Sequence, residues 1–235
     1  MDWYTVIPTK DRPAELGNLV DSLMANGVAD PSTILIINNG KPSGVPEWLR
    51  DRAVILPDGN RGAHIYQQWN WGLDWAQRLA TGVNRPDKWP THPHAVAILN
   101  DDVELPADFA ARMIECLRDT DVTIAFPDQG PGIVNQPPPK HADPSNKLDY
   151  DKRITGYAFV VNGKHGIRCD ENFKWWYGDD DLDWQARRDF NGTWEVDVTV
   201  KHLYPSESTN ADPERAAQAA RDRETFISKW GKAPW

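Results

Sequence analysis

The sequence predicts an α/β domain with a mostly parallel central sheet flanked by helices. Short apolar runs, typical of strands that are buried on both faces, recur along the chain, and Val96–Leu99 is the clearest of them. Segments with apolar residues at helical spacing lie between these runs. The first two runs and the segment between them form a β-α-β unit, whose crossover we expect to be right-handed.

The N-terminal half contains four expected strands and two expected helices. The strands are Trp3–Ile7, Thr33–Ile37, Val54–Leu56 and Val96–Leu99. One helix begins at Pro13, a residue that suits the first helical turn, and ends at Gly27. It has one apolar stripe, which consists of Leu16, Leu19, Val20, Leu23 and Met24. The second helix has residues at helical spacing from Tyr66 to Ala80.

The C-terminal half continues the alternation. Helices are expected after Pro106, at Asp181–Phe190, and from Asp212–Pro213 to about Trp230. Strands are expected at Val122–Phe126, Thr155–Asn162 and Thr193–Val200. The last strand alternates apolar and polar residues, which indicates a strand that is half exposed or at an edge. The proline-rich stretch Pro127–Arg153 is expected to be a long loop, and such loops are usually functional or disordered.

The composition argues against several classes of protein. The chain has 235 residues and a net charge of −9, so nucleic acid or anionic membrane is not expected to be bound mainly by charge. The two cysteines lack metal-ligand spacing and are expected to be buried thiols. The start of the chain does not resemble a signal peptide, and no apolar run approaches the roughly 20 residues of a membrane span. We therefore expect a soluble cytoplasmic protein with no membrane insertion and no obligate protein partner.

Acidic or metal-binding side chains stand at the ends of three predicted elements. Asp101 and Asp102 follow the buried strand Val96–Leu99, Asp179–Asp183 precede or begin a helix, and His202 follows the last strand. Carboxylates at the carboxyl ends of parallel strands lie where open α/β folds bind ligands. Carboxylates together with an imidazole suit Mn²⁺ or Mg²⁺. Each group alone has a simpler interpretation, since an aspartate run is more typical of a solvated turn and a lone histidine of packing.

Other polar residues follow the strands of the N-terminal β-α-β unit: Thr9, Arg12, Asn38 and Asn39. They outline a crevice large enough for a nucleotide. Twelve tryptophans are also present, and tryptophan stacks well on sugar rings and bases, although most of the twelve are expected in the core.

Taken in order, several segments resemble glycosyltransferase family 2, of the GT-A type. The resemblance covers VIPTKDRPAELGNLVDSL, IINNG, AILNDDVEL, the stretch from TGYAFVV to ARRDFNG, KHLYPSEST and FISKWG. Asn60, Gly62, Asn70 and Gly72 match the family's Asn-x-Gly spacing, Asp180–Asp181 take the place of its Glu-Asp motif, and Arg187 follows. Two positions depart from the pattern. Asn100 replaces the first aspartate of the DxD motif, and Asn38 replaces an aspartate that often contacts the base or ribose.

The resemblance implies a GT-A fold and transfer of a sugar from a nucleotide-diphosphate donor, with UDP favoured, to a hydroxyl group. Metal ligands would be Asp102 and His202. Asp181 would be the general base of an inverting reaction, its pKa raised by Asp179, Asp180 and Asp183, while Asp180 would orient hydroxyl groups. Donor contacts would come from Pro8, Thr9, Arg12, Asn38, Asn39, Asn60, Gly62, Asn70, Asn100 and Asp101. Sugar or acceptor contacts would come from Trp175, Trp176, Asp179 and Arg187.

The implied domain organisation is a catalytic domain, residues 1–204, with a C-terminal extension, residues 205–235. Within it, residues 1–100 would bind the nucleotide and residues 101–204 would hold the acceptor. The segments 127–153 and 205–212 would close over the substrates. The acceptor would be a saccharide, a protein or a hydroxylated DNA base, and the chain would suit a phage or a bacterium.

Two other functions compete with glycosyl transfer. A sugar nucleotidyltransferase shares the α/β layout but would need a glycine-rich basic loop after the first strand, and PTKDRP has no glycine. A non-catalytic saccharide-binding protein would explain the tryptophans, but it would not need acidic groups at three separate element ends.

Overall fold

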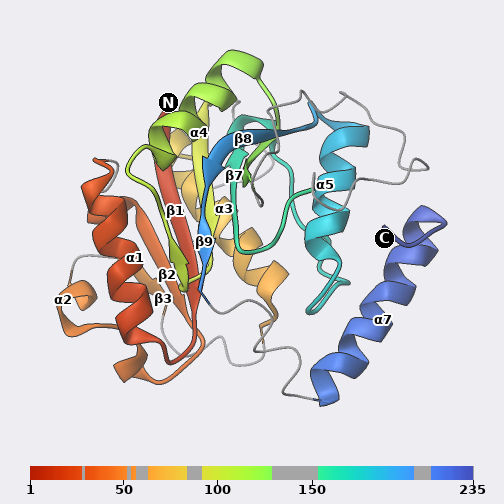
Figure 1. Ribbon diagram of the computed structural model, residues 1–235, viewed down its shortest axis with the longest axis horizontal. Helices are drawn as coiled ribbons and strands as arrows, with labels where there is room; N and C mark the ends of the chain where they lie inside the picture. Colours follow the sequence, from red (N-terminus) through yellow and green to blue (C-terminus); the bar gives the residue numbers. More distant parts are fainter. Residues whose placement is uncertain are drawn as a thin grey trace.

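The computed structural model describes residues 1–27, 30–51, 54–56, 63–83, 92–128, 153–203 and 213–234, with the backbone alone for 54–56. Its centre is a seven-stranded sheet in the order β3-β2-β1-β4-β7-β6-β8 (Figure 1). The strands are β1 (Asp2–Thr9), β2 (Ile34–Asn38), β3 (Val54–Leu56), β4 (His94–Leu99), β6 (Ile124–Asp128), β7 (Ala158–Asn162) and β8 (Thr193–Thr199). Strand β7 runs antiparallel to both β4 and β6, and the other pairings described in this central sheet are parallel. The predicted mostly parallel sheet is confirmed.

Helices cover both faces of this sheet. They are α1 (Pro13–Ala25), α2 (Glu47–Arg50), α3 (Ile65–Thr81), α4 (Phe109–Thr120), α5 (Gly178–Asp189) and α7 (Pro213–Trp230). Apolar residues of α1, α2 and α4 pack in one core cluster, and those of α3, α5 and α7 pack in the other. Short 3₁₀ turns occur at Pro31–Thr33, Pro42–Gly44 and Gly163–His165. Within the described ranges, no helix has both the length and the apolar character that crossing a membrane requires.

The two cores follow from the side-chain alternation of the central strands. Val96 and Ile98 of β4 enter one cluster, whereas Ala95, Ala97 and Leu99 enter the other. All five are almost fully buried, as a strand covered on both faces requires. This explains why the sequence of β4 is a continuous apolar run.

The structure differs from the sequence predictions in several details. Met24 was expected in the buried stripe of α1, but its side chain is 40% exposed because it lies at the edge of the stripe, next to the last residue of the helix. Helix α5 begins at Gly178, three residues earlier than expected, so Asp179 and Asp180 are helical. A second sheet, made of β5 (Val103–Glu104) and β9 (Lys201–His202), was not predicted, since two-residue strands leave no periodic signal.

The C-terminal helix α7 is part of the core. Its Phe226 is fully buried and packs edge-on against Trp184 of α5, with ring centroids 4.9 Å apart. Figure 1 shows α7 lying beside α5 at one end of the sheet. The boundary between a domain of residues 1–204 and an extension of residues 205–235 remains a prediction.

A buried histidine in β4 leads to a testable pH dependence. The ring of His94 is fully buried. Its Nδ1 lies 2.8 Å from the carbonyl oxygen of His92, and its Nε2 has no hydrogen-bond partner among the residues that the structure describes. Burial lowers the pKa of His94, so the imidazole stays neutral in the folded protein. The unfolded chain binds a proton below its ordinary pKa of about 6.5. The free energy of unfolding should therefore fall as pH decreases below that value.

Urea denaturation at pH 7.5 and at pH 5.5 measures this effect. The His94→Leu variant should lose part of the difference between the two pH values, whatever its absolute stability. A variant with the same pH difference as the wild type would show that His94 does not contribute.

Candidate active site

A cavity of about 490 Å³ lies at the C-terminal end of β1 and the start of α3. This volume is within the range of about 300–1,000 Å³ that is typical of small-molecule sites. The position, beyond the carboxyl ends of parallel strands, is the one expected for ligand binding in an open α/β sheet. The cavity is lined by Pro8, Thr9, Lys10, Arg12, Asn39, Ala63, His64, Ile65, Gln68, Asn100, Asp101, Lys174, Trp175 and Arg215.

Seven of the residues predicted to contact substrate lie in this wall: Pro8, Thr9, Arg12, Asn39, Asn100, Asp101 and Trp175. They come from the ends of β1, β2 and β4 and from the segment before α5. The topology brings the first three groups together because β1 lies between β2 and β4.

Asp101 and Asp102 are joined to the end of β1 by a short polar network. The hydroxyl of Thr9 donates to Oδ2 of Asp101 at 2.7 Å. Nη1 of Arg12 lies 3.4 Å from Oδ1 of Asp101 and 2.5 Å from Oδ2 of Asp102. Both carboxylates are buried, and the Arg12 guanidinium neutralises part of their concentrated negative charge.

The two carboxyl groups have pKa values displaced in opposite directions. Burial raises the pKa of Asp101, although the Thr9 hydrogen bond and the Arg12 charge oppose it. Burial also acts to raise the pKa of Asp102, but the contacts with His202 and Arg12 outweigh it and hold the pKa below the usual value. Asp102 is thus the carboxyl that stays ionised to lower pH.

The pairing of β5 with β9 places His202 beside Asp102. Val103 pairs with His202, and the backbone N–H of Leu203 donates to the carbonyl oxygen of Asp102 at 2.9 Å. The His202 ring stacks on Tyr157, with centroids 4.8 Å apart and planes at 18°. These contacts fix the imidazole so that its Nε2 lies 3.3 Å from Oδ1 of Asp102.

The Asp102–His202 pair fits a divalent cation. Oδ1 of Asp102 is buried, and no described residue donates a hydrogen bond of good geometry to it. An oxygen that can bind a metal ion therefore lies beside the His202 ring nitrogen. Carboxylate oxygen and imidazole nitrogen are both ligand atoms that Mn²⁺ accepts. Among the residues that the structure describes, no three His, Cys, Asp or Glu side chains are grouped to hold a metal ion. The described part of the chain therefore offers two ligands, and a bound substrate would have to complete the shell.

The predicted acidic segment forms the first turns of α5, and its aspartates differ in environment. Asp179 is partly exposed, and its Oδ2 accepts the backbone N–H of Gly156 at 3.0 Å. Asp180 is buried in an ion pair with Arg153. Asp183 is buried, and its carboxylate lies 3.0 Å from Nε of Arg187, a predicted substrate contact. The carboxylate of Asp179 is thus the most exposed of the three.

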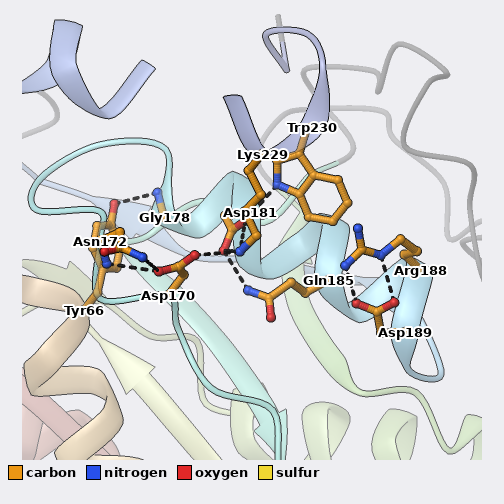
Figure 2. A network of polar contacts seen from close by, with 10 residues as sticks. All are labelled: Tyr66, Asp170, Asn172, Gly178, Asp181, Gln185, Arg188, Asp189, Lys229 and Trp230. Carbon is orange, nitrogen blue, oxygen red and sulfur yellow. Dashed lines mark hydrogen bonds and ion pairs between the residues drawn. The ribbon is translucent and has the colours of Figure 1, made fainter. Parts of the chain in front are cut away.

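The carboxylate of Asp181 is enclosed by the C-terminal helix (Figure 2). Its side chain is fully buried. The indole Nε1 of Trp230 donates at 2.7 Å, Nζ of Lys229 lies at 2.8 Å, and the amide of Gln185 donates at 2.6 Å. Every oxygen of this carboxylate is engaged, and α7 blocks access to it.

Asp181 has a raised pKa, but the cause differs from the expected one. Burial is the main cause, and Lys229 and Trp230 act to lower the pKa. The like charge that adds to the effect is Asp170, rather than the neighbouring aspartates of α5.

Tyr66 of α3 holds the turn that precedes α5. Its buried hydroxyl donates to the carbonyl oxygen of Trp175 at 3.2 Å and accepts the N–H of Gly178 at 3.0 Å. A Cβ on Gly178 would lie 2.3 Å from the Tyr66 ring, which explains the glycine. Tyr177 has a left-handed backbone, φ 65°, an unusual conformation for a bulky residue that often marks a functional site.

Three other predicted site residues have local structural partners and do not line the cavity. Both side-chain groups of Asn38 bond the backbone of the following turn, at Gly40 and Lys41. Asn70 bonds both backbone groups of Cys169, at 2.8 and 3.0 Å. Trp176 packs against the core cluster that contains the apolar residues of α3, α5 and α7. Asn60 and Gly62, and most of the segments 127–153 and 205–212, lie outside the described residues.

Four polar residues of the cavity wall were not singled out from the sequence: His64, Gln68, Lys174 and Arg215. His64 precedes α3, and Gln68 lies in its first turn. The buried Oε1 of Gln68 has no hydrogen-bond partner within the described ranges. Lys174 and Arg215 are brought to the cavity by tertiary packing alone. The sequence has no periodic or motif signal that distinguishes them from surface cations.

Comparison with known proteins identifies the family of this chain. The sequence pattern described as Glycosyl transferase family 2 matches residues 4–176, which is most of the chain. The chain belongs to glycosyltransferase family 2. The match covers six strands of the central sheet, from β1 to β7, and reaches the tryptophan pair before α5. The predicted resemblance is confirmed. A search of curated protein sequences gives no significant match.

Solved glycosyltransferase structures share the fold. S. aureus TarS 1–349 superposes with a TM-score of 0.59 at 11% identity, over 97% of this chain and 70% of that one. GalNAc-T7 with UDP, GalNAc and Mn²⁺ gives 0.64 at 13% identity, over 95% of this chain and 48% of that one. The mannosyltransferase PcManGT from Pyrobaculum calidifontis, with GDP-Man and Mn²⁺, gives 0.55 at 14% identity, over 99% and 66%. The predicted GT-A fold is confirmed; the family 2 chain spans less than two thirds of the last two proteins.

Proposed function

We propose that this family 2 chain transfers a sugar from a nucleotide-diphosphate donor to a hydroxyl group, with a divalent cation and with inversion at the anomeric carbon. One observation carries the proposal. Arg12 and Asp101 line the cavity, and they also belong to the polar group at the carboxyl edge of the sheet that includes Asp102 and His202. Structural neighbours determined with UDP or GDP-Man and with Mn²⁺ support the same chemistry.

Within the proposal, the cavity holds the nucleotide. Thr9, Asn39 and Asn100 offer hydrogen-bonding groups for base and ribose, and Asp101 contacts the ribose or the donor sugar. Arg12 and Lys10 place positive charge near the diphosphate. We retain UDP as the favoured nucleotide. The acceptor is a hydroxyl of a saccharide, a protein or a modified DNA base, in the cytoplasm of a bacterium or of a cell infected by a phage.

Asp102 and His202 are the residues that would hold the cation. When bound there, a divalent ion would stabilise the charge that develops on the leaving diphosphate. The pKa of Asp102 lies below its usual value, so its carboxylate is available as a ligand at neutral pH. The Tyr157 ring supports the His202 imidazole from one face.

We assign the general base to Asp179 in place of Asp181. A base must approach the proton it removes to about 2.6–3.2 Å. The carboxylate of Asp181 has Trp230, Lys229 and Gln185 around it, whereas Asp179 is partly exposed. Asp179 also bonds Gly156, next to Tyr157, whose ring stacks on His202, so the base lies near the cation ligands.

The proposed reaction uses these residues in one displacement. The acceptor hydroxyl gives its proton to a carboxylate oxygen of Asp179, and its oxygen forms a bond to the anomeric carbon. The bond between that carbon and the diphosphate oxygen breaks, and the nucleoside diphosphate leaves with the electron pair. A single base opposite the leaving group gives inversion. Asp180, held by Arg153, is a positioning residue for the turn that presents Asp179.

Incubation with a panel of sugar nucleotides tests the function. We expect slow release of free nucleoside diphosphate from one donor, because transferases usually hydrolyse their own donor slowly. The measurement is chromatography of the nucleotide with and without Mn²⁺. A protein that binds saccharides without releasing nucleotide from any donor would contradict the proposal, as would formation of pyrophosphate from a nucleoside triphosphate and a sugar phosphate.

A further inference from the structure

We infer that the C-terminal helix α7 supplies a donor-binding residue, Arg215, whose guanidinium contacts the diphosphate. The inference rests on the proposed function. Arg215 lies in the first turn of α7 and forms part of the cavity wall together with Lys174 and Trp175. Its guanidinium carbon lies 4.6 Å from the centroid of the Trp175 ring, which holds the cation over the aromatic face.

The charge of the cavity wall favours an anionic ligand. Four of the lining residues are cationic, Lys10, Arg12, Lys174 and Arg215, and one, Asp101, is acidic. This is the reverse of the whole chain, whose net charge is −9. Arg12 is engaged with Asp101 and Asp102, so much of its charge is already balanced. Lys174 and Arg215 add positive charge from the C-terminal half of the chain.

A buried anchor fixes the helix face that carries Arg215. Asp222 is almost fully buried and accepts three successive backbone N–H groups, those of Lys174, Trp175 and Trp176, at 3.2, 2.7 and 2.9 Å. It lies seven residues after Arg215, two helical turns along the same face. The face that is bonded to residues 174–176 is therefore the face that presents Arg215 to Trp175.

The far end of α7 is fixed on the same face. Lys229, seven residues after Asp222, contacts Asp170 and Asp181, and Trp230 donates to Asp181 (Figure 2). Two anchors thus hold the helix in place, and they fix the backbone position of Arg215 at its start. A planar guanidinium in such a position can bind phosphate oxygens through two parallel hydrogen bonds.

Binding of nucleotides to purified variants tests the role of Arg215. Titration calorimetry with Mn²⁺ would compare UDP and GDP with uridine and guanosine for the wild type and for Arg215→Met. We expect roughly 10- to 100-fold weaker binding of the preferred diphosphate, the usual cost of losing a charge-assisted hydrogen bond. Binding of the matching nucleoside should change less than about twofold, because a nucleoside has no phosphate for the guanidinium to contact.

Matched controls separate a phosphate contact from a structural effect. Arg221→Met removes an exposed arginine of the same helix, whose guanidinium bonds Gln218, and should leave both affinities unchanged. Arg215→Lys keeps the charge and should recover part of the diphosphate affinity. Thermal unfolding of each variant monitors the fold.

The outcomes distinguish this inference from the proposed function. A wild-type protein that binds neither UDP nor GDP would overturn the proposed function and this inference together. A wild type that binds a diphosphate and an Arg215→Met variant that binds it equally would overturn the inference alone. Equal weakening of diphosphate and nucleoside would also overturn it, because Arg215 would then act through Trp175 on the cavity wall.

Discussion

The Asp179→Asn substitution is expected to lower kcat by roughly 10²- to 10⁴-fold, the usual contribution of a general base. The amide has nearly the shape of the carboxylate and can still accept the Gly156 N–H, so the turn should stay in place. KM for the donor should change little, because Asp179 is not part of the nucleotide cavity. Steady-state kinetics of transfer, or of donor hydrolysis, measure the change.

The matched control is Asp181→Asn, two residues along the same helix. Here the carboxylate neutralises Lys229 and accepts from Trp230, so its loss should weaken the contact between α5 and α7. We expect a loss of about 1–3 kcal/mol in the free energy of unfolding, less than for a fully buried ion pair because the Lys229 side chain is 28% exposed. Residual activity of the folded fraction should exceed that of Asp179→Asn.

The reverse pattern would contradict the assignment of Asp179 as the general base. If Asp179→Asn keeps near wild-type kcat while folded Asp181→Asn is inactive, the base is Asp181. Helix α7 would then have to move away from α5 before acceptor binding. Denaturation curves for both variants are needed to interpret the kinetics.

The fold could be predicted from the sequence because its strands are buried on both faces. The continuous apolar run of β4 and the helical spacing in α1 and α3 are local signals, and they reported the element types correctly. The carboxylates after β4 also had a predictable place, since β1 and β4 end at the same edge of the sheet. Strand β7 runs antiparallel, but an apolar strand carries no local mark of its direction.

The roles of the aspartates in α5 could not be read from their order. Successive helical residues point about 100° apart, so neighbours in sequence face different surroundings. Which of Asp179, Asp180 and Asp181 remains accessible depends on where α7 and Arg153 pack. Asn70 is a similar case, because its motif spacing suggested a substrate contact whereas its amide bonds Cys169, 99 residues away.

The cation site predicts the second large effect. Asp102→Asn should lower metal-dependent transfer by roughly 10²- to 10³-fold, since a Lewis acid on a leaving diphosphate contributes several kcal/mol. The amide is a poor ligand for Mn²⁺, and it also leaves Arg12 with one carboxylate partner fewer. His202→Ala should have a smaller effect, seen mainly as a higher Mn²⁺ requirement, because the substrate oxygens and Asp102 remain.

Binding of Mn²⁺ can be followed apart from turnover, by electron paramagnetic resonance in the presence of UDP or GDP. We expect the wild type to bind the ion tightly only with the diphosphate present, because the described residues provide two ligands rather than a closed site. Exhaustive chelation should abolish transfer, and added Mn²⁺ should restore it. If transfer survives chelation, Asp102 and His202 do not hold a catalytic cation. The short Arg12–Asp102 ion pair would then be a structural link between β1 and β4, and the charge on the leaving group would have to be balanced by the cations of the cavity wall.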